Sequence, residues 1–290
     1  MGDKSESSGS RKRRRDEADE EEEKTEAAGD ADEAPSLEDS LMFSDTLVAL
    51  RIMRAQFPRI DKVAIEPFVL RSQLYSSVKD RTQVDRELET LKRENMLRIF
   101  KLNTGQDDHA IMFLEDYLNQ HVSFNRSMQI ERVTKRLEEN KKSDTEVLEW
   151  FKKYVIDCKL EPSIDHQELC LLLSNGGKVK DEHISLLING GLLVRLMFVL
   201  QTRQLIDPNM YWFAIPNIGS ILKGLSQGRK ELLSLLKRRR YKEMMLAPLE
   251  KKRLRFSPLD IRFHLRDLIG SGHLKTLCTP TGLVVRVSKD

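Results

Sequence analysis

The sequence has 290 residues and a net charge of only +3. A chain of this length holds one to three domains, because a single hydrophobic core seldom grows beyond about 250 residues. No apolar run approaches the roughly 18 residues that a membrane-spanning helix needs, and no apolar segment follows the charged N-terminus. We therefore expect a soluble, intracellular protein and not a membrane or secreted one.

The small net charge conceals three regions of different character. Residues 1–40 contain seven basic and fifteen acidic residues, whereas residues 41–218 contain 25 of each. Residues 219–290 contain 17 basic and six acidic residues, a net charge of +11. A protein attracts a polyanion where its charge is concentrated. A nucleic-acid partner is therefore expected at the C-terminal quarter, unless the excess charge is merely the solvated face of a helix.

The first 40 residues are predicted to be a disordered, charged tail. They are rich in Ser, Gly, Ala and Glu, and Leu37 is their only large aliphatic residue after the initiator methionine. Such a segment buries too little apolar surface to offset the entropy of ordering. A basic run in this tail is typical of a nuclear-import signal or a non-specific phosphate contact. The acidic block at 16–23 favours import; the run consists of Arg11, Lys12, Arg13, Arg14 and Arg15.

From residue 41 onward, helical periodicity is followed by short β-prone segments, and this order recurs. The first copy has predicted helices at 41–57, 67–75 and 80–95, the last capped by Asp80. Strands at 97–102 and 110–114 flank a loop whose composition is typical of a hairpin. A helix, two shorter helices and a hairpin are the elements of a winged helix.

Two further copies follow. The second begins with a polar helix at 115–140 and continues with helices at 146–154, 165–173 and 180–189 and strands at 192–200 and 211–215. The third has helices at 218–242, 244–249 and 257–270 and strands at 274–279 and 283–287. We therefore predict an α+β, predominantly helical fold with three tandem winged-helix domains, at 41–118, 119–217 and 218–290.

No constellation of residues indicates catalysis. A kinase needs a loop over the phosphates, a lysine, a catalytic base and metal-binding carboxylates. The sequence has no G-x-G-x-x-G, H-R-D or D-F-G, and Glu66 stands where a V-A-I-K motif would place its lysine. The segment Asn175–Lys178 resembles the end of a phosphate loop but lacks the upstream glycine and the following Ser or Thr. We therefore expect no enzyme activity and no nucleotide cofactor.

The histidines and cysteines do not have the spacing of zinc ligands. Cys158, Cys170 and Cys278 are far apart and have apolar neighbours, so we expect buried, reduced thiols. No metal site is predicted.

The basic residues of the C-terminal quarter are the candidates for contact with double-stranded DNA. Lys223, Lys230 and Lys237 recur every seven residues along one face of the predicted helix at 218–242, opposite its apolar stripe. The helix at 257–270 occupies the recognition-helix position of a winged helix. Most of these side chains should contact backbone phosphates and give little base specificity. The complete set is Lys223, Arg229, Lys230, Lys237, Arg238, Arg239, Arg240, Lys242, Arg255, Arg262 and Arg266.

Several stretches resemble a known family. They are 69–75 (VLRSQLY), 80–82 (DRT), Asp85-Arg86, Lys242-Glu243 and 266–270 (RDLIG). With these stretches, residues 44–287 resemble the serine/threonine-protein kinase 19 family. The resemblance implies three winged helices and, despite the name, a nuclear, non-catalytic DNA-binding factor for transcription-coupled nucleotide excision repair. It also implies partners at stalled RNA polymerase II: the Cockayne-syndrome ubiquitin-ligase subunit, the ultraviolet-sensitivity scaffold protein and the repair helicase complex.

If the third domain holds DNA, the neutral first two are free to contact proteins. Arg71, Lys79, Arg81 and Arg86 are candidate contacts to DNA or a partner, although pairing with neighbouring carboxylates would also explain them. Two other readings stay open at this point: an atypical protein kinase, and a protein-binding scaffold whose basic end touches acidic tails.

Overall fold

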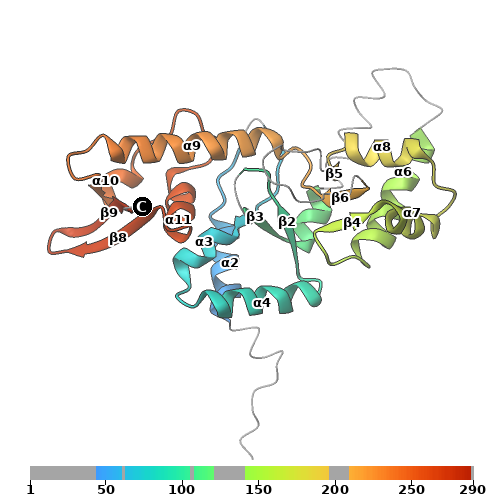
Figure 1. Cartoon of the computed structure of the whole chain (residues 1–290), viewed down its shortest axis with the longest axis horizontal. Coiled ribbons are helices and arrows are strands. Elements are labelled where there is room, and N and C mark those ends of the chain that lie inside the picture. Colours follow the sequence, from blue (N-terminus) through green and yellow to red (C-terminus); the bar gives the residue numbers. More distant parts are fainter. Residues whose placement is uncertain (1–43, 61–62, 105–107, 121–140, 196–208, 289–290) are drawn as a thin grey trace, which may run out of the picture. The chain divides into compact units, whose positions relative to one another are not determined.

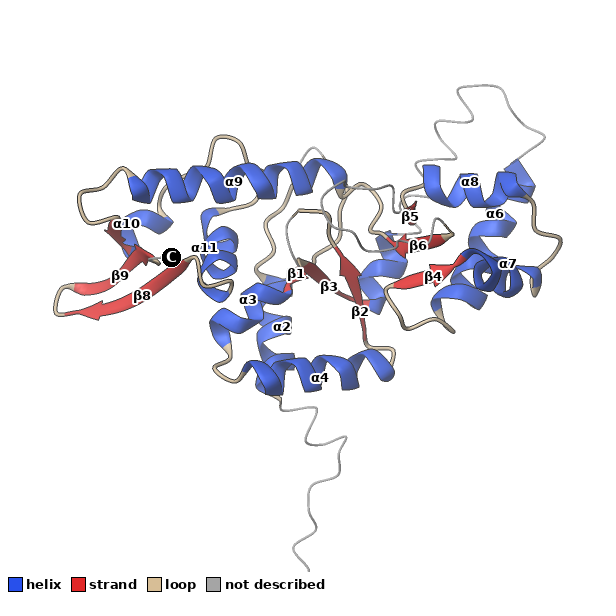
Figure 2. Cartoon of the chain, viewed as in Figure 1, coloured by secondary structure: helices blue, strands red, loops and turns tan. Residues whose placement is uncertain are grey.

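The computed structural model describes residues 44–60, 63–104, 108–120, 141–195 and 209–288. In these residues one order of elements occurs three times: a helix, a short strand, two further helices and a hairpin (Figures 1 and 2). Each repeat forms a three-stranded antiparallel sheet with the last strand in the middle. The architecture is thus mixed α+β. We call residues 44–120, 141–215 and 219–288 the first, second and third modules; all described residues belong to one compact unit.

The first module begins with a helix capped by the Ser44 hydroxyl, which accepts from the Leu47 N–H at 3.1 Å. The Asp80 carboxylate caps another helix by accepting from the Thr82 and Gln83 N–H groups, as predicted. Leucine-rich faces of these helices pack on the sheet. The elements are α2 (Asp45–Ala55), β1 (Val69–Leu70), α3 (Arg71–Ser77), α4 (Arg81–Arg93), β2 (Leu97–Lys101) and β3 (His109–Phe113).

The second module begins with a helix that continues into a π-helical turn. Asp165 caps the next helix by accepting from the Gln167 N–H at 2.8 Å. Gly176 and Gly177 lie against the Trp150 ring, where a β-carbon would overlap the indole. These glycines therefore serve packing in a turn. The elements are α6 (Lys141–Trp150), η1 (Phe151–Ile156), β4 (Ser163–Asp165), α7 (His166–Ser174), α8 (Asp181–Asn189), β5 (Leu193–Arg195) and β6 (Met210–Phe213).

The third module has the longest described helix, whose two halves pack in different cores. Ile221 and Leu225 join a core cluster that contains residues of all three modules, whereas Leu232 and Leu236 join the core of the third module. The Asp260 carboxylate caps the last helix by accepting from the Phe263 N–H at 2.7 Å. The elements are α9 (Gly219–Lys237), β7 (Glu243–Met245), α10 (Leu246–Glu250), α11 (Ile261–Gly270), β8 (Leu274–Thr279) and β9 (Gly282–Val287).

Several predicted bounds of helices and strands are wrong. The helices expected at 67–75 and 244–249 begin only at Arg71 and Leu246, because the short strands β1 and β7 occupy the residues just before them. The strand β4 was not predicted. The helix expected at 218–242 ends at Lys237. The last helix begins at Ile261 and not at 257. Residues 114–120 are helical, but the rest of the helix predicted at 115–140 lies outside the described residues, as do residues 1–40 and the end of the strand predicted at 192–200.

The first and second modules are joined through Arg98 of β2. This side chain is buried, and its guanidinium donates to the carbonyl oxygens of Ile156 at 2.6 Å and Lys159 at 2.7 Å. The guanidinium carbon also lies 5.0 Å from the centre of the Phe213 ring. Backbone oxygens and an aromatic face thus take the place of water around a buried cation.

The first and third modules meet where α11 packs against α3. Gly270 lies directly on the Ser72 carbonyl group, with no room for a β-carbon. The Gln73 side-chain amide donates to the Phe263 carbonyl oxygen at 3.1 Å, and Arg81 donates to the Gly270 carbonyl oxygen at 3.0 Å. Because most of α11 is buried, this helix is not free to enter a DNA groove.

We expect Gly270→Ala to lower the free energy of unfolding by at least about 2 kcal/mol, because the new methyl group must displace the Ser72 backbone. Gly219→Ala is the matched control, since nothing lies within 4 Å of its added β-carbon. The control should change stability by less than about 1 kcal/mol. Urea unfolding of the two variants measures both effects. Equal stability of the two would show that α3 and α11 do not pack as described.

Candidate nucleic-acid interface

The basic run at the end of α9 lies on a helix end and a turn. The helix stops at Lys237, Arg238 is its C-cap, and Lys242 has a φ of 53° before β7 begins. All six residues from Lys237 to Lys242 are exposed. The change in chain direction after Lys237 divides the cations into two sets. In a helix that continued to residue 242 they would have formed one surface.

The first set lines a groove beside α9, which we call the α9 groove. Its cations come from the helix, from the helix end and from the loop before α11. The Glu231 carboxylate in this groove accepts from the backbone N–H groups of Arg255 (3.0 Å) and Phe256 (3.3 Å), so it fixes the loop against the helix. Four cations therefore face one carboxylate that is already engaged. The lining residues are Gln227, Lys230, Glu231, Ser234, Leu235, Arg238, Arg239, Arg255 and Phe256.

The second set lies around the turn and the adjacent sheet, and we call it the turn cluster. Lys237, Arg240 and Lys242 line a hollow together with Tyr241, His273 and Arg286. Arg286 pairs with Glu243 across the β7–β9 ladder, with its Nη2 atom 2.5 Å from a carboxylate oxygen. The charge available to a ligand here thus comes mainly from the turn.

Lys223, Arg262 and Arg266 do not join these two sets. Lys223 is exposed on the first half of α9. The Arg262 side chain is 61% exposed and lies 3.6 Å from Glu250. Arg266 is only partly exposed and donates to the Gln56 side chain of the first module, so it is less available to a ligand than Arg262.

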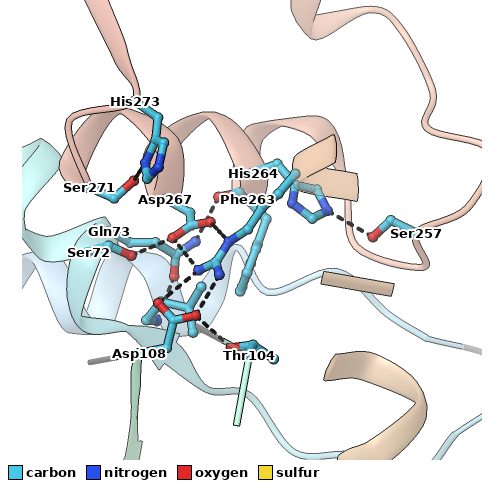
Figure 3. Close-up of polar contacts among 12 residues, drawn as sticks. Ser72, Gln73, Thr104, Asp108, Ser257, Phe263, His264, Asp267, Ser271 and His273 are labelled. Carbon is cyan, nitrogen blue, oxygen red and sulfur yellow. Dashed lines mark hydrogen bonds and ion pairs between the residues drawn. The ribbon is translucent and has the colours of Figure 1, made fainter. Parts of the chain in front are cut away.

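Arg229 was predicted to contact DNA, but its side chain is engaged inside the protein. Its guanidinium lies between two carboxylates, 2.5 Å from Asp108 and 2.6 Å from Asp267 (Figure 3). The Ser72 hydroxyl also donates to Asp267, and the Thr104 hydroxyl donates to Asp108, both at 2.6 Å. The Arg229 side chain is 17% exposed and that of Asp267 is fully buried. Its charge is neutralised inside the protein, so Arg229 is not a phosphate-binding residue.

The electrostatics of this bridge follow from burial and hydrogen bonding. Burial by itself would lower the pKa of Arg229, but the hydrogen bonds from its guanidinium to Asp267 and Asp108 raise it above its usual range. Burial would raise the pKa of Asp108, yet the hydrogen bonds from Arg229 and Thr104 lower it. The sequence offered one signal for the pairing: Asp267 lies between Leu265 and Leu268 on an apolar helix, where a carboxylate needs a cationic partner.

The four candidates of the first module have different surroundings. Arg71 pairs with Asp85 at 2.9 Å, as the alternative reading of these residues had it. Arg81 contacts the Gly270 carbonyl oxygen and lies 5.1 Å from the Tyr75 ring centre. Lys79 and Arg86 are exposed. The predicted import run, Arg11 to Arg15, lies outside the described residues.

The described part of the chain offers no metal centre, because no group of three or more His, Cys, Asp or Glu residues there is placed to hold an ion. None of its helices has the length and hydrophobicity to cross a membrane. The prediction of buried cysteines is wrong: Cys158 and Cys278 are exposed, and Cys170 is partly exposed.

Next to the bridge, His264 is a buried histidine whose Nε2 atom lies 2.8 Å from the Ser257 hydroxyl. Burial lowers its pKa to about 4, a shift that Asp267 and Glu231 oppose and Arg229 assists. Below pH 6.5 the unfolded chain therefore takes up a proton that the folded protein excludes.

We expect His264 to cost the protein up to about 3 kcal/mol of stability as the pH falls from 6.5 to 4. His264→Gln should remove this part of the pH dependence, whereas His273→Gln, at an exposed position, should retain it. Urea unfolding across that pH window measures the slopes. Parallel curves for the wild type and His264→Gln would contradict the assignment.

Arg229→Met should lower the free energy of unfolding by about 3 kcal/mol, because it leaves the buried Asp267 without its cation. Lys230→Met removes the same charge from the adjacent, exposed position and should change stability by less than about 0.5 kcal/mol. Thermal and urea unfolding distinguish the two. Similar losses in both variants would mean that Arg229 acts only through net charge.

A family model described as inactive serine-threonine protein kinase 19 matches residues 32–287. Proteins named Winged helix repair factor 1 are similar as well. The Dictyostelium discoideum protein is 28% identical over 280 residues, 88% of this chain and 68% of that protein. The Homo sapiens protein is 29% identical over 236 residues, 80% of this chain and 81% of that protein.

The Xenopus laevis protein of the same name is 27% identical over 249 residues, which cover 83% of each chain. The family model spans far more than half of the 290 residues, including all three described modules. This chain therefore belongs to the family described as inactive serine-threonine protein kinase 19.

Proposed function

We propose that this chain is a non-catalytic DNA-binding adaptor in DNA repair, built from three tandem winged-helix domains at 41–118, 119–217 and 218–290. The recurring order of helix, strand, two helices and hairpin supports this division, since each module has its own three-stranded sheet. The name of the relatives, Winged helix repair factor 1, points to the same fold and process.

The observation that carries the proposal is the exposed, largely unpaired positive charge around the end of α9. Helix, loop and turn present seven cations to solvent, while the helix in the recognition position packs against α3. Cations on a surface without a free recognition helix contact phosphates and not base edges. The proposed contacts are Lys230, Arg238, Arg239 and Arg255 in the α9 groove and Lys237, Arg240 and Lys242 in the turn cluster. Lys223 and Arg262 are exposed outside both sets and are proposed as additional phosphate contacts.

We place this activity in the nucleus, in transcription-coupled nucleotide excision repair, with the basic run Arg11 to Arg15 as the import signal. The neutral first and second modules would contact proteins and so bridge stalled RNA polymerase II to repair factors. The partners we propose are the Cockayne-syndrome ligase subunit, the ultraviolet-sensitivity scaffold protein and the repair helicase complex. The support is the relatives' description as repair factors and the charge difference between the modules.

A protein-kinase function has less support. The family is described as inactive, and the glycine pair that resembled a phosphate loop packs against Trp150. A β-carbon would not fit there, so packing alone accounts for glycine at both positions. The third alternative, a scaffold that touches acidic protein tails with its basic end, is separated from DNA binding by the following measurement.

We expect reversal of four charges, Lys237→Glu, Arg238→Glu, Arg239→Glu and Arg240→Glu, to weaken binding of the full chain to duplex DNA by more than about tenfold at low salt. Because each lost phosphate contact removes about 0.9 from the slope of log K against log salt, the slope should flatten by roughly three to four. Binding across a salt series measures both quantities.

The control is a variant with the same change in net charge in the first two modules: Arg51, Arg59, Lys152 and Lys153, all exposed, each changed to Glu. It should retain most of the wild-type affinity and slope. If the variant with residues 237–240 changed to Glu were folded and bound duplex DNA as the wild type does, the proposed interface would be wrong. The result would favour the alternative of a protein-binding scaffold. Equal losses in both variants would assign the effect to net charge alone.

A further inference from the structure

Two aromatic side chains in the third module are unusually exposed. In the described part of the chain, Tyr241 and Phe256 are the only exposed Phe, Tyr or Trp residues, at 63% and 60% exposure. Each follows an arginine whose guanidinium lies over its ring, at 5.3 Å for Arg240 and 5.6 Å for Arg255. An exposed phenylalanine loses the free energy that burial would provide, so its position among cations is informative.

Phe256 is the better placed of the two. It lies in the α9 groove with Lys230, Arg238 and Arg239, and its backbone N–H donates to Glu231 at 3.3 Å. That carboxylate also holds the Arg255 N–H, so the loop that carries the ring is anchored to α9 at two successive residues. The backbone that carries the ring is therefore held in place, which reduces the conformational entropy lost when a ligand stacks on the ring.

A flat aromatic face among phosphate-binding cations fits an unpaired nucleotide. In a duplex, each base is stacked between its neighbours and offers no face to a protein ring. A base outside the duplex stacks readily on aromatic side chains, while cations follow the adjacent phosphates. Arg255 covers one face of the Phe256 ring, and a base on the other face would complete a stack of guanidinium, ring and base.

We propose that the α9 groove binds DNA with unpaired bases, one of which stacks on Phe256 while its flanking phosphates contact Lys230, Arg238 and Arg239. This inference rests on the proposed function, because it assigns a DNA structure to the same surface. It predicts preference for DNA that is locally open, without preference for sequence. The alternative is that an aromatic side chain of a protein partner stacks on the Phe256 ring, and the following experiment distinguishes that contact from a stacked base.

The experiment compares binding of the full chain to a DNA duplex and to the same duplex with a short central bubble of mismatches. The wild type should prefer the bubble. Phe256→Ala should lose about tenfold of its affinity for the bubble, the effect of one stacked base, and little for the duplex. Phe256→Tyr should keep the preference, whereas Phe256→Leu, which retains apolar bulk without a π face, should behave as the alanine variant does.

Leu171→Ala is the matched control, since it removes a more exposed apolar side chain, at 69%, from α7 of the second module. It should bind both DNAs as the wild type does. A 5-iododeoxyuridine placed in the bubble should cross-link to Phe256 on irradiation, and mass spectrometry locates the adduct. Circular dichroism and thermal unfolding check that each variant is folded.

The inference would be overturned if the wild type and Phe256→Ala bound the bubble with equal affinity, or if the cross-link formed only at other residues. Phe256 would then be assigned to contact with a protein partner. The proposed function would survive that result if the charge-reversed variant still lost duplex binding. If charge reversal also had no effect, both proposals would fail. A full preference for the bubble in Phe256→Leu would likewise overturn stacking.

Discussion

The ion pairs of Arg229 are the constraint on which the relation between the first and third modules depends. One guanidinium from α9 holds a carboxylate that precedes β3 and another on α11 (Figure 3). A fully buried carboxylate such as Asp267 is strongly unfavourable without a cation and further donors, which Arg229 and Ser72 provide. These contacts hold α11 on α3 at the point where Gly270 permits close approach.

This arrangement decides which surface is left for a ligand. A winged helix that reads base edges inserts its third helix into the major groove. In the winged-helix domain proposed for the third module that helix would be α11, and its side chains are used for packing against α3 and for the bridge. The module's free positive charge lies instead at the end of α9, so its affinity for DNA would come from phosphates. The first two modules have no net charge and so add no comparable positive electrostatic potential.

Much of the fold followed from local sequence signals. Asp80 and Asp165 mark helix starts, and β-prone segments around turns mark the hairpins. The strands β1, β4 and β7 were missed because two or three residues are too few to show periodicity, and only pairing with a distant strand creates them. The end of α9 was missed because neither Gly nor Pro marks it. The position of the basic surface was predicted from charge counts, but its division into two sets depends on the turn after Lys237.

Arg229 and Lys230 show why composition alone could not define the interface. They are adjacent, carry the same charge and were predicted to have the same role, yet successive residues on a helix point about 100° apart. One meets two carboxylates, 121 and 38 residues away in the sequence, and the other faces the α9 groove.

Phe256 was not predicted as a site residue, because the predicted interface rested on charged residues and not on exposed aromatic ones. It lies exposed on a loop whose backbone is bound by Glu231, a contact that no spacing rule reveals. Charge concentrated in one module supplies affinity for any nucleic acid, and affinity that rests on phosphates is the same for every sequence. Under the proposals made above, discrimination would come from the structure of the DNA, through an unpaired base stacked on Phe256, and from protein partners of the other two modules.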